Sequence, residues 1–520
     1  MLTKPAAYPK TLSFFLGWLA VAALPPFYIF PALFVSLPGI LLLIQDAPCS
    51  RAAFGRGYAF GFAFFAFGLS WIGNALLIDA AVFGWLYPLA LLACGFFFGL
   101  FIAVPAWLSW YFKPLCAKYF AFPALWVLFE WLRSFVLTGF PWNLLGTVLA
   151  FDDRLIQFAA VGGTYALSLA VLFITAAPAF YIHNRTRRTL AAVLAIILSG
   201  PVFLYAFGAF RIHNHPLNAS DIKIRIVQPD IPQKVKWRDD VLESNFAKYI
   251  ALSQTPGQED IDFTVWGETA SPFPLDLDAV HLRQLLPAVP PQGYLVTGLV
   301  RYQFDRISRY IPYNSMFVID RDGNIPAYYD KSHLVPFGEY IPLRDYLPDW
   351  IRPVANVIGT FRSGPGPQRI ELPGYPSFGG LICYEIIFPH QIVASRNRPA
   401  WIINLTNDGW YGDSAGPRQH LVAARLRAVE EGISIVRAAN TGISAVITPL
   451  GIVSASLGLN QTGVLDTFLP QPADFSTTYG KYGNTLTLIW CLCNLLLAFC
   501  LTFRTLHIKN YFNRDTHSEN

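Results

Sequence analysis

Apolar residues run almost without interruption through most of the first 210 positions, and charged residues gather in the gaps between the runs. About 20 consecutive apolar residues cross a bilayer as a helix, so each run predicts a transmembrane helix. The runs cover 11–44 (two spans, divided at Pro25-Pro26), 57–78, 80–112, 119–137, 155–182, 189–210 and about 484–503. The pattern predicts an integral membrane α-helical bundle of about eight transmembrane helices, with a long insert before the last one.

The insert, residues 215–475, follows a different pattern, in which charges return and short apolar stretches alternate with helical ones. Residues 221–227 (DIKIRIV) alternate polar and apolar side chains, as a half-buried strand does. The other predicted strands are 262–268, 294–300, 313–320, 378–383, 400–408 and 443–449, with a helix over 416–432. Strands alternating with helices predict an α/β domain. We expect seven helices in 1–212, the inserted domain in 213–475, the last helix in 476–508 and a cytoplasmic tail in 509–520.

The composition agrees with a large membrane part. The 520 residues are 54% hydrophobic and 14% charged, with a mean hydropathy of +0.40, whereas soluble globular chains contain about 25% charged residues. The net charge of +5 is modest, and the sequence lacks the clustered basic face that nucleic-acid binding requires. We therefore expect a membrane-embedded protein without a nucleic-acid partner.

Basic residues gather at alternate connections between the predicted spans, and such residues mark the cytoplasmic side of a membrane. The connections on one side contain Lys4, Lys10, Arg51, Arg56, Lys113, Lys118, Arg185, Arg187, Arg188, Arg504, Lys509 and Arg514. The opposite connections contain little beyond Arg154 and Arg211. This distribution predicts a cytoplasmic N-terminus and an insert on the outer side of the membrane.

Polar side chains follow three of the apolar stretches in the insert. Glu268 ends DFTVWGE, Lys331 and Glu339 lie in AYYDKSHLVPFGEYIP, and Cys383 and Glu385 end FGGLICYE. Catalytic groups in α/β folds commonly lie at strand ends. A thiol at a sharp turn after a strand is exposed to substrate, and a backbone N–H beside it can stabilise an oxyanion.

Each of these residues also has a structural interpretation. Cys383 is the one cysteine of seven outside the membrane-like segments, but a lone cysteine in an apolar strand is more often part of the core. Glu268 could be an acidic residue at a helix N-terminus, and Lys331 could be a charge on the surface. Glu339 and Glu385 could be partners in ion pairs. For each residue by itself, the structural interpretation is favoured. For the residues together, in this order and with these neighbours, a catalytic role is favoured. Without a Cys-x-x-Cys pair or a nucleotide motif, we expect neither a metal site nor a cofactor.

The flanking residues extend this pattern. WGETASPF, YDKSHLVPFGEY and LICYEIIFP, in this order, resemble the Glu, Lys and Cys elements of the nitrilase (carbon–nitrogen hydrolase) superfamily. QPDIPQKVKW (228–237) and NLTNDGWYGDSAGPRQH (404–420), with the flanking helices, resemble the apolipoprotein N-acyltransferase family. The resemblance implies an extracytoplasmic nitrilase-like αββα sandwich, inserted in a multi-pass bundle of the bacterial inner (cytoplasmic) membrane and facing the periplasm.

The resemblance also implies a reaction. Cys383 would be the nucleophile, Glu268 the general base, and Lys331 the residue that stabilises the tetrahedral intermediate. A phospholipid would donate an acyl group to Cys383 as a thioester. The amino group of a diacylglyceryl-modified apolipoprotein would then accept it, in the last step of lipoprotein maturation. Two steps through an acyl-enzyme make a ping-pong scheme.

Four further residues match positions that are important in that family. Glu339 is expected to orient Lys331 or the incoming amine, and Tyr384 and Glu385 to shape the turn after the nucleophile. Trp237 either contacts acyl chains or is an aromatic residue at the membrane interface, and both interpretations stay open.

Two other features leave alternatives. A Cys–His dyad with His333 would be a competing mechanism, although a structural histidine is favoured. The Gly-rich stretch 407–412 predicts a lid, a lipid entry gate or a simple turn.

Two other classes of function fit parts of the sequence. A membrane-anchored nitrilase-type amidase or hydrolase would use the same three residues, but it needs one membrane anchor at most. A transporter or scaffold would explain the spans, but transporters commonly contain internal repeats or broken helices, and the sequence shows neither. The acyltransferase interpretation is therefore favoured.

Overall fold

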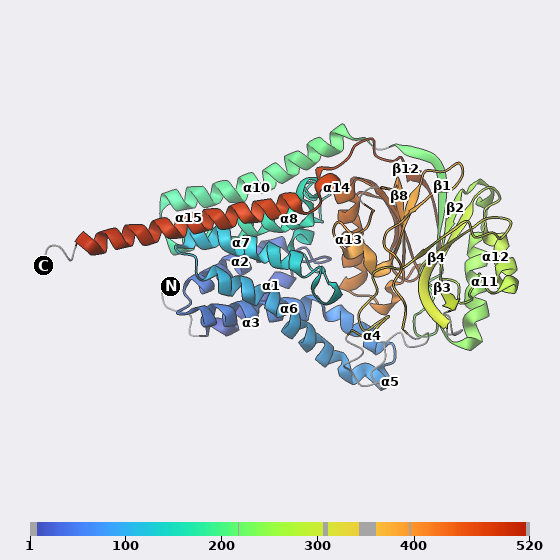
Figure 1. Cartoon of the computed structure of the whole chain (residues 1–520), viewed down its shortest axis with the longest axis horizontal. Helices are drawn as coiled ribbons and strands as arrows, with labels where there is room; N and C mark the ends of the chain where they lie inside the picture. The colour runs from blue at the N-terminus through green and yellow to red at the C-terminus, as the bar shows by residue number, and fades with distance from the viewer. Residues whose placement is uncertain (1–7, 217, 305–309, 343–359, 395–396, 516–520) are drawn as a thin grey trace. The chain divides into compact units, whose positions relative to one another are not determined.

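The computed structural model describes residues 8–216, 218–304, 310–342, 360–394 and 397–515 (Figure 1). The chain divides into two compact units. One unit comprises Met1–Ser70, Pro88–Asn214 and Tyr482–Asn520 and is helical. The other comprises Trp71–Tyr87 and His215–Lys481 and contains both β-sheets.

The helical unit packs apolar helices of different lengths side by side. They are α1 (Pro9–Val21), α2 (Leu33–Gln45), α3 (Ser50–Gly68), α6 (Tyr87–Ser109), α7 (Leu115–Leu132), α8 (Ala159–Ala176), α9 (Pro178–His183), α10 (Arg187–Asn214) and α15 (Thr485–Asp515). Small residues bring some of these helices very close together. A Cβ atom on Gly17 of α1 would lie 2.1 Å from the carbonyl oxygen of Phe60 in α3, so only glycine fits there.

Five helices in the described part of the chain are long and apolar enough to cross a bilayer. They are Ala80–Ser109, Leu115–Leu132, Ala159–His183, Arg187–Asn214 and Thr485–His507. Ser50–Gly68 and Ser70–Leu77, bent by 50°, make a sixth if they form one span. Several candidate spans are therefore present, but the predicted number of eight is not confirmed.

The difference from eight lies at the N-terminal end. The predicted hairpin over 11–44 contains α1 and α2, which have 13 residues each. At about 1.5 Å per residue each is about 20 Å long, shorter than the ~30 Å hydrocarbon core of a bilayer. Pro25 and Pro26 lie between the two helices, where proline prevents either from continuing.

The second unit contains two six-stranded sheets. The first has the order β12 (Gly463–Pro470), β1 (Ala219–Gln228), β2 (Phe263–Val265), β3 (Tyr294–Phe304), β4 (Tyr310–Ile319), β5 (Ala327–Asp330). The second has the order β11 (Val453–Leu457), β10 (Ser444–Ile447), β9 (Ser434–Ala439), β8 (Trp401–Thr406), β7 (Phe378–Ile382), β6 (Arg369–Ile370). Strands β1, β2 and β3 are parallel, as are β7, β8 and β9.

Apolar side chains fill the space between the sheets, including Ile226 and Phe263 from one sheet and Phe378 and Trp401 from the other. Helices α11 (Leu242–Ser253) and α12 (Ala279–Leu285) cover the outer face of the first sheet. Helix α13 (Ala415–Glu431) lies beside the second sheet (Figure 1). The predicted αββα sandwich is thus confirmed.

Parallel strands present their carboxyl ends at one edge of a sheet, which is where α/β proteins usually bind ligands. The segments that follow β2, β5, β7 and β8 contain Glu268, Lys331, Cys383 and Asp408 respectively. The strand β5 directly before Lys331 was not predicted, since its four residues make too short an apolar pattern.

Candidate active site

Cys383 follows β7 directly and begins a 3-10 turn, Cys383–Ile387. Its φ of +51° lies in the left-handed region, which is strained for a residue with a side chain. The residue is 5% exposed. Strain of this kind persists only where the surroundings impose it, so the turn is built to hold the sulfur in one place.

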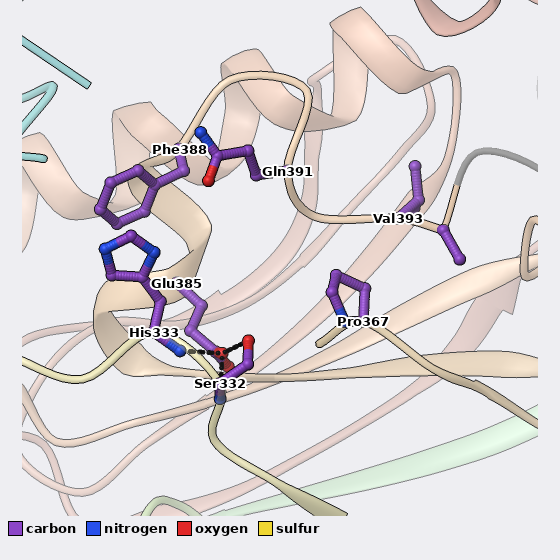
Figure 2. Close-up of a pocket in the computed structure, with 8 residues that line it drawn as sticks. Ser332, His333, Pro367, Glu385, Phe388, Gln391 and Val393 are labelled. Carbon is purple, nitrogen blue, oxygen red and sulfur yellow. Dashed lines mark hydrogen bonds between the residues drawn. The ribbon is translucent and has the colours of Figure 1, made fainter. Parts of the chain in front are cut away.

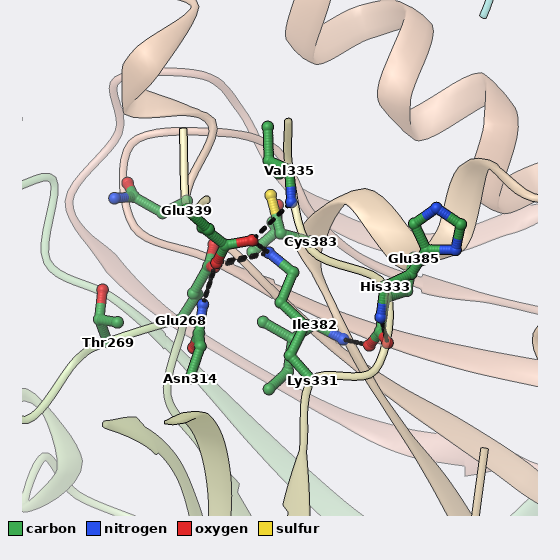
Figure 3. A network of polar contacts seen from close by, with 12 residues as sticks. Glu268, Thr269, Asn314, Lys331, His333, Val335, Glu339, Ile382, Cys383 and Glu385 are labelled. Carbon is green, nitrogen blue, oxygen red and sulfur yellow. Dashed lines mark hydrogen bonds and ion pairs between the residues drawn. The ribbon is translucent and has the colours of Figure 1, made fainter. Parts of the chain in front are cut away.

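Lys331 joins two glutamates beside this cysteine (Figure 3). Its Nζ lies 2.9 Å from Oε2 and 3.0 Å from Oε1 of Glu339, and 3.6 Å from Oε1 of Glu268. The backbone N–H of Val335 also donates to Oε2 of Glu339, at 2.8 Å. All three charged side chains are buried. The structure places Glu268, Lys331 and Glu339 beside Cys383.

Asn314 connects the two glutamates. It lies within β4, and its Nδ2 donates to Oε1 of Glu268 at 2.8 Å and to Oε1 of Glu339 at 2.9 Å. One amide group therefore fixes the spacing of two carboxylates that would otherwise repel each other. Sequence reasoning missed Asn314, because an asparagine in the middle of a strand gives no catalytic pattern by itself; only its place in YNSMFVID marks it.

Burial and these charges shift the pKa values of the lysine and the cysteine. Burial lowers the pKa of Lys331, but the carboxylates of Glu339 and Glu268 outweigh this effect, so its pKa is raised and the side chain is an ammonium. Burial and the nearby Glu268 carboxylate raise the pKa of the Cys383 thiol, although Lys331 acts in the opposite direction. The resting cysteine is therefore a protonated thiol, which needs a base before it can attack.

Lys236 is a second buried lysine at this site. Its Nζ donates to the backbone carbonyl of Glu268 at 3.0 Å and to Oγ1 of Thr269 at 2.8 Å. Thr269 has a φ of +45°, and a Cβ on Gly298 would approach its backbone nitrogen to 2.5 Å. Lys236 thus holds the strained turn that contains Glu268. Burial lowers its pKa to about 8, with Glu268 and Cys383 acting in the opposite direction.

Trp237 is half-buried and packs against a small cluster that includes Val300, Leu334 and Phe361. Its ring lies 5.7 Å from Nζ of Lys236. The predicted Trp237 is therefore a neighbour of the site, next to Lys236, which the sequence analysis did not select. A lysine in QKVKW resembles an ordinary surface charge.

Glu385 binds the segment after Lys331 to the segment of Cys383. Its Oε1 accepts hydrogen bonds from the Tyr329 hydroxyl, the backbone and hydroxyl of Ser332 and the backbone of His333, at 2.7 to 3.0 Å. Its Oε2 accepts one from the backbone of Ile382 at 2.7 Å. Glu385 therefore joins the two sheets at the site, and its carboxylate faces backbone groups.

A pocket of about 330 Å³ adjoins Glu385 (Figure 2). It is lined by Ser332, His333, Pro367, Glu385, Phe388, Gln391, Val393 and Ala394. The ring of His333 stacks on Phe388, with centroids 3.8 Å apart, and Tyr384 packs edge-on against Phe388 at 5.1 Å. His333 thus has the packing role that the sequence favours, and Tyr384 shapes the same side of the turn.

Three further buried polar residues, Asp408, His420 and Arg437, form a second network that reaches Cys383. Asp408 accepts hydrogen bonds from Nη2 of Arg437 at 2.7 Å, and its Oδ1 lies 2.8 Å from Nδ1 of His420. Nε2 of His420 lies 3.1 Å from the carbonyl oxygen of Cys383. Burial raises the pKa of Asp408, but Arg437 and His420 outweigh it and lower the value to about 2. Asp408 belongs to the Gly-rich stretch 407–412. Its hydrogen bonds to Arg437 and His420 favour a simple turn there over a lid or a lipid entry gate.

Cys383, Asp408 and His420 offer ligand atoms within 4.8 Å of one another. Thiolate, imidazole and carboxylate are ligand types that zinc accepts. However, both nitrogens of His420 and the carboxylate of Asp408 already have hydrogen-bond partners. The arrangement is therefore that of a hydrogen-bond network. Sequence reasoning missed both residues, although NLTNDGWYGDSAGPRQH contains them.

Comparisons with known proteins agree with this architecture. Residues 16–177 match the model of the apolipoprotein N-acyltransferase N-terminal domain, and residues 223–471 match the carbon-nitrogen hydrolase model. Apolipoprotein N-acyltransferase of Rhodopseudomonas palustris is 39% identical, covering 90% of both chains. The enzyme of the same name from Bradyrhizobium diazoefficiens is 39% identical, covering 93% of both chains. The one from Rickettsia prowazekii is 34% identical, covering 95% of this chain and 98% of the Rickettsia chain. The chain belongs to the apolipoprotein N-acyltransferase family.

Proposed function

We propose that the protein transfers a fatty acyl chain from a phospholipid to the α-amino group of the N-terminal diacylglyceryl-cysteine of an apolipoprotein. The observation that supports this most directly is the group of charged side chains around Cys383, in a chain that matches acyltransferases over nine-tenths of its length. The reaction proceeds through a thioester on Cys383 and completes lipoprotein maturation.

In the first half-reaction, Glu268 takes the proton from the Cys383 thiol as the sulfur attacks an ester carbonyl of the phospholipid. The ammonium of Lys331 stabilises the oxyanion that forms. When the intermediate collapses, the ester bond breaks, Glu268 returns the proton to the leaving alkoxide, and lysophospholipid departs. The raised pKa of the thiol makes the base necessary, because thiolate is scarce at neutral pH without it.

In the second half-reaction, the amine of the apolipoprotein attacks the thioester carbonyl. Glu268 takes a proton from the nitrogen, and Lys331 again faces the oxyanion. The carbon–sulfur bond breaks, an amide forms, and the proton returns to the sulfur of Cys383. The enzyme is then ready for another phospholipid, and no cofactor takes part.

The supporting residues have separate parts in this scheme. Glu339 orients Lys331, with which it forms a hydrogen bond and an ion pair. Tyr384 and Glu385 hold the turn of Cys383 against the segment of Lys331. Trp237, half-buried beside Lys236, contacts an acyl chain.

The candidate spans and the family are those of a bacterial membrane protein. We further propose eight spans, seven within 1–212 and one within 476–508, in the inner membrane. The domain at 213–475 lies on the periplasmic side and 509–520 form a cytoplasmic tail. The distribution of basic residues along the sequence supports this orientation.

Intact mass measurement tests the proposal. The full-length protein is incubated with a phospholipid of one defined acyl chain in detergent micelles, without an acceptor. A mass increase of one acyl group, removed by hydroxylamine as thioesters are, is expected for the wild type and for a Cys493→Ala control, and is absent in Cys383→Ala. A wild type that gains no labile acyl group overturns the proposal. Release of free fatty acid or ammonia without an acceptor would identify a hydrolase or amidase.

A further inference from the structure

Helix α13 holds the turn of Cys383 at both ends. Nε2 of His420 lies 3.1 Å from the carbonyl oxygen of Cys383, and Nη1 of Arg427 donates to the carbonyl of Ile387 at 3.1 Å. The two side chains are seven positions apart, about two helical turns, so they lie on the same face of the helix. Cys383 and Ile387 are the first and last residues of the 3-10 turn.

We propose that His420 is a positioning residue for acyl transfer, which fixes the Cys383–Tyr384 peptide group by donating a hydrogen bond from Nε2 to the carbonyl of Cys383. The proposal rests on the function proposed above, in which Cys383 is the nucleophile. It gives a role to a fully buried histidine that the scheme of Glu268 and Lys331 does not use.

The peptide group that follows Cys383 needs such an anchor. A residue with a side chain avoids the positive φ that Cys383 adopts, so the turn would relax without contacts that impose it. The peptide unit is planar and trans, so its C=O and N–H point in opposite directions. A hydrogen bond to the carbonyl of Cys383 therefore also sets the direction of the N–H of Tyr384, the type of donor that stabilises an oxyanion beside a nucleophile.

The surroundings of His420 keep its ring in one orientation. Nδ1 lies 2.8 Å from Oδ1 of Asp408 and 3.0 Å from Nη2 of Arg437, and the same guanidinium nitrogen donates to Oδ2 of Asp408. All three side chains are fully or almost fully buried. Asp408 is confined in turn, because a Cβ on Gly442 would lie 2.4 Å from its carboxylate.

The hydrogen bonds also decide whether His420 can act as a base, as the histidine of a Cys–His–Asp arrangement would. A carbonyl oxygen can only accept, so Nε2 must bear the proton. Nδ1 then accepts from Arg437 in the neutral ring, or donates to Asp408 in the charged ring. Burial and Arg437 lower the pKa of His420, which favours the neutral ring. In either form, Nε2 has no lone pair with which to take a proton from the thiol.

Two amide substitutions separate the possible roles. Glutamine places an amide nitrogen near the position of Nε2, and asparagine places one near that of Nδ1. We expect His420→Gln to retain the reactivity of Cys383 to within about threefold. We expect His420→Asn to lower the reactivity of Cys383 by about tenfold, because this variant loses the hydrogen bond to the carbonyl of Cys383. The readouts are the alkylation rate of Cys383 by iodoacetamide, followed on its tryptic peptide, and the rate of acyl-enzyme formation from phospholipid.

The same two substitutions at His281 are the control and should leave both rates unchanged. The His281 ring lies within 2.9 Å of carboxylate oxygens of Glu243, on α11, and of Asp278, the N-cap residue of α12. Equal loss of both rates in His420→Gln and His420→Asn would assign a general base and overturn the proposal. Equal loss of thermal stability with unchanged alkylation of the folded protein would also overturn it. Alkylation needs no lipid, so a difference between the variants in alkylation, with no acyl-enzyme in the wild type, would support the positioning role and refute acyl transfer.

Discussion

The ammonium of Lys331 lies 2.9 Å from a carboxylate oxygen of Glu339 but 3.6 Å from the nearest one of Glu268. Lys331 is thus held mainly by Glu339, while Glu268 receives its shorter hydrogen bond, 2.8 Å, from the neutral amide of Asn314. The proposed base is therefore spared a tight ion pair with the proposed oxyanion stabiliser. Two glutamates have different tasks because their partners differ.

Glu339→Gln tests this division of tasks. The substitution keeps the shape of the side chain but removes the charge, so Lys331 should move toward Glu268 and weaken it as a base. We expect acyl-enzyme formation to slow by about 10²-fold, the size of effect found when one electrostatic group of an active site is lost. Single-turnover mass spectrometry measures the rate.

Glu371→Gln is the matched control. This exposed carboxylate lies 2.9 Å from Arg369, and exposed pairs of this kind contribute little. The control should keep the wild-type rate to within about twofold. A Glu339→Gln variant as fast as the control would show that Glu268 and Lys331 need no third charge.

Lys236 predicts a pH effect on the reaction. Its pKa of about 8 means that the ammonium that holds the Glu268 turn loses its proton slightly above neutral pH. We expect acyl-enzyme formation to fall above about pH 8 in the wild type. Below about pH 8, Lys236→Met should be slower than the wild type by about tenfold, for the loss of its hydrogen bonds. Its rate should not fall further above pH 8, so the difference from the wild type should shrink there. The exposed Lys234→Met is the control, with the wild-type profile expected.

Lys236 also predicts a pH effect on stability. An unfolded lysine has a pKa of about 10.4, so the folded-state value is lowered. Its contribution to stability is present above pH ~10.4 and is lost as the pH falls toward the folded-state pKa of about 8. The unfolding temperature of Lys236→Met, measured relative to the wild type, should therefore be higher at pH 7 than at pH 10. The opposite order would contradict a buried ammonium at this position.

Glu385→Gln should uncouple the Lys331 and Cys383 segments. The carboxylate accepts from backbone groups on both sides, whereas an amide has one oxygen and would turn its NH2 against Ile382 or against Ser332 and His333. Each buried donor left without an acceptor costs about 1–3 kcal/mol. We expect a lower unfolding temperature together with slower alkylation of Cys383, measured by calorimetry and peptide mass spectrometry. Wild-type stability in this variant would show that the bridge is dispensable.

The parts of the site that the sequence predicts are those marked by a strand end. Glu268 and Cys383 each end a predicted strand, and Lys331 follows the short AYYD stretch. All three have distinctive neighbours, so their order in the chain is informative. Asn314 and Lys236 have no such mark, because their roles depend on which strand and which turn lie beside them in the folded sandwich.

The fold shows the same limit. Seven strand stretches of the insert and the helix at 416–432 correspond to β1, β2, β3, β4, β7, β8, β10 and α13. Five strands, β5, β6, β9, β11 and β12, are not among the predicted ones. Strand β6 has two residues and β5 has four, which is too short for a clear hydrophobic period. Shortness does not explain β9, β11 and β12, which have six, five and eight residues. Hydropathy also places two spans within 11–44, whereas the structure gives each segment a helix of 13 residues, because composition alone does not show where a helix ends.

The most direct test of the proposed reaction is a chase of the acyl-enzyme. Acyl-Cys383 is formed from phospholipid, the remaining lipid is removed, and one of two lipopeptides is added. Both begin with diacylglyceryl-cysteine, and one has its α-amino group blocked by acetylation. We predict that the open lipopeptide removes the acyl group from Cys383 and gains its mass as a hydroxylamine-resistant amide, while the blocked one leaves the thioester in place. Equal decay of the thioester with both lipopeptides, with release of free fatty acid, would contradict transfer to an amine.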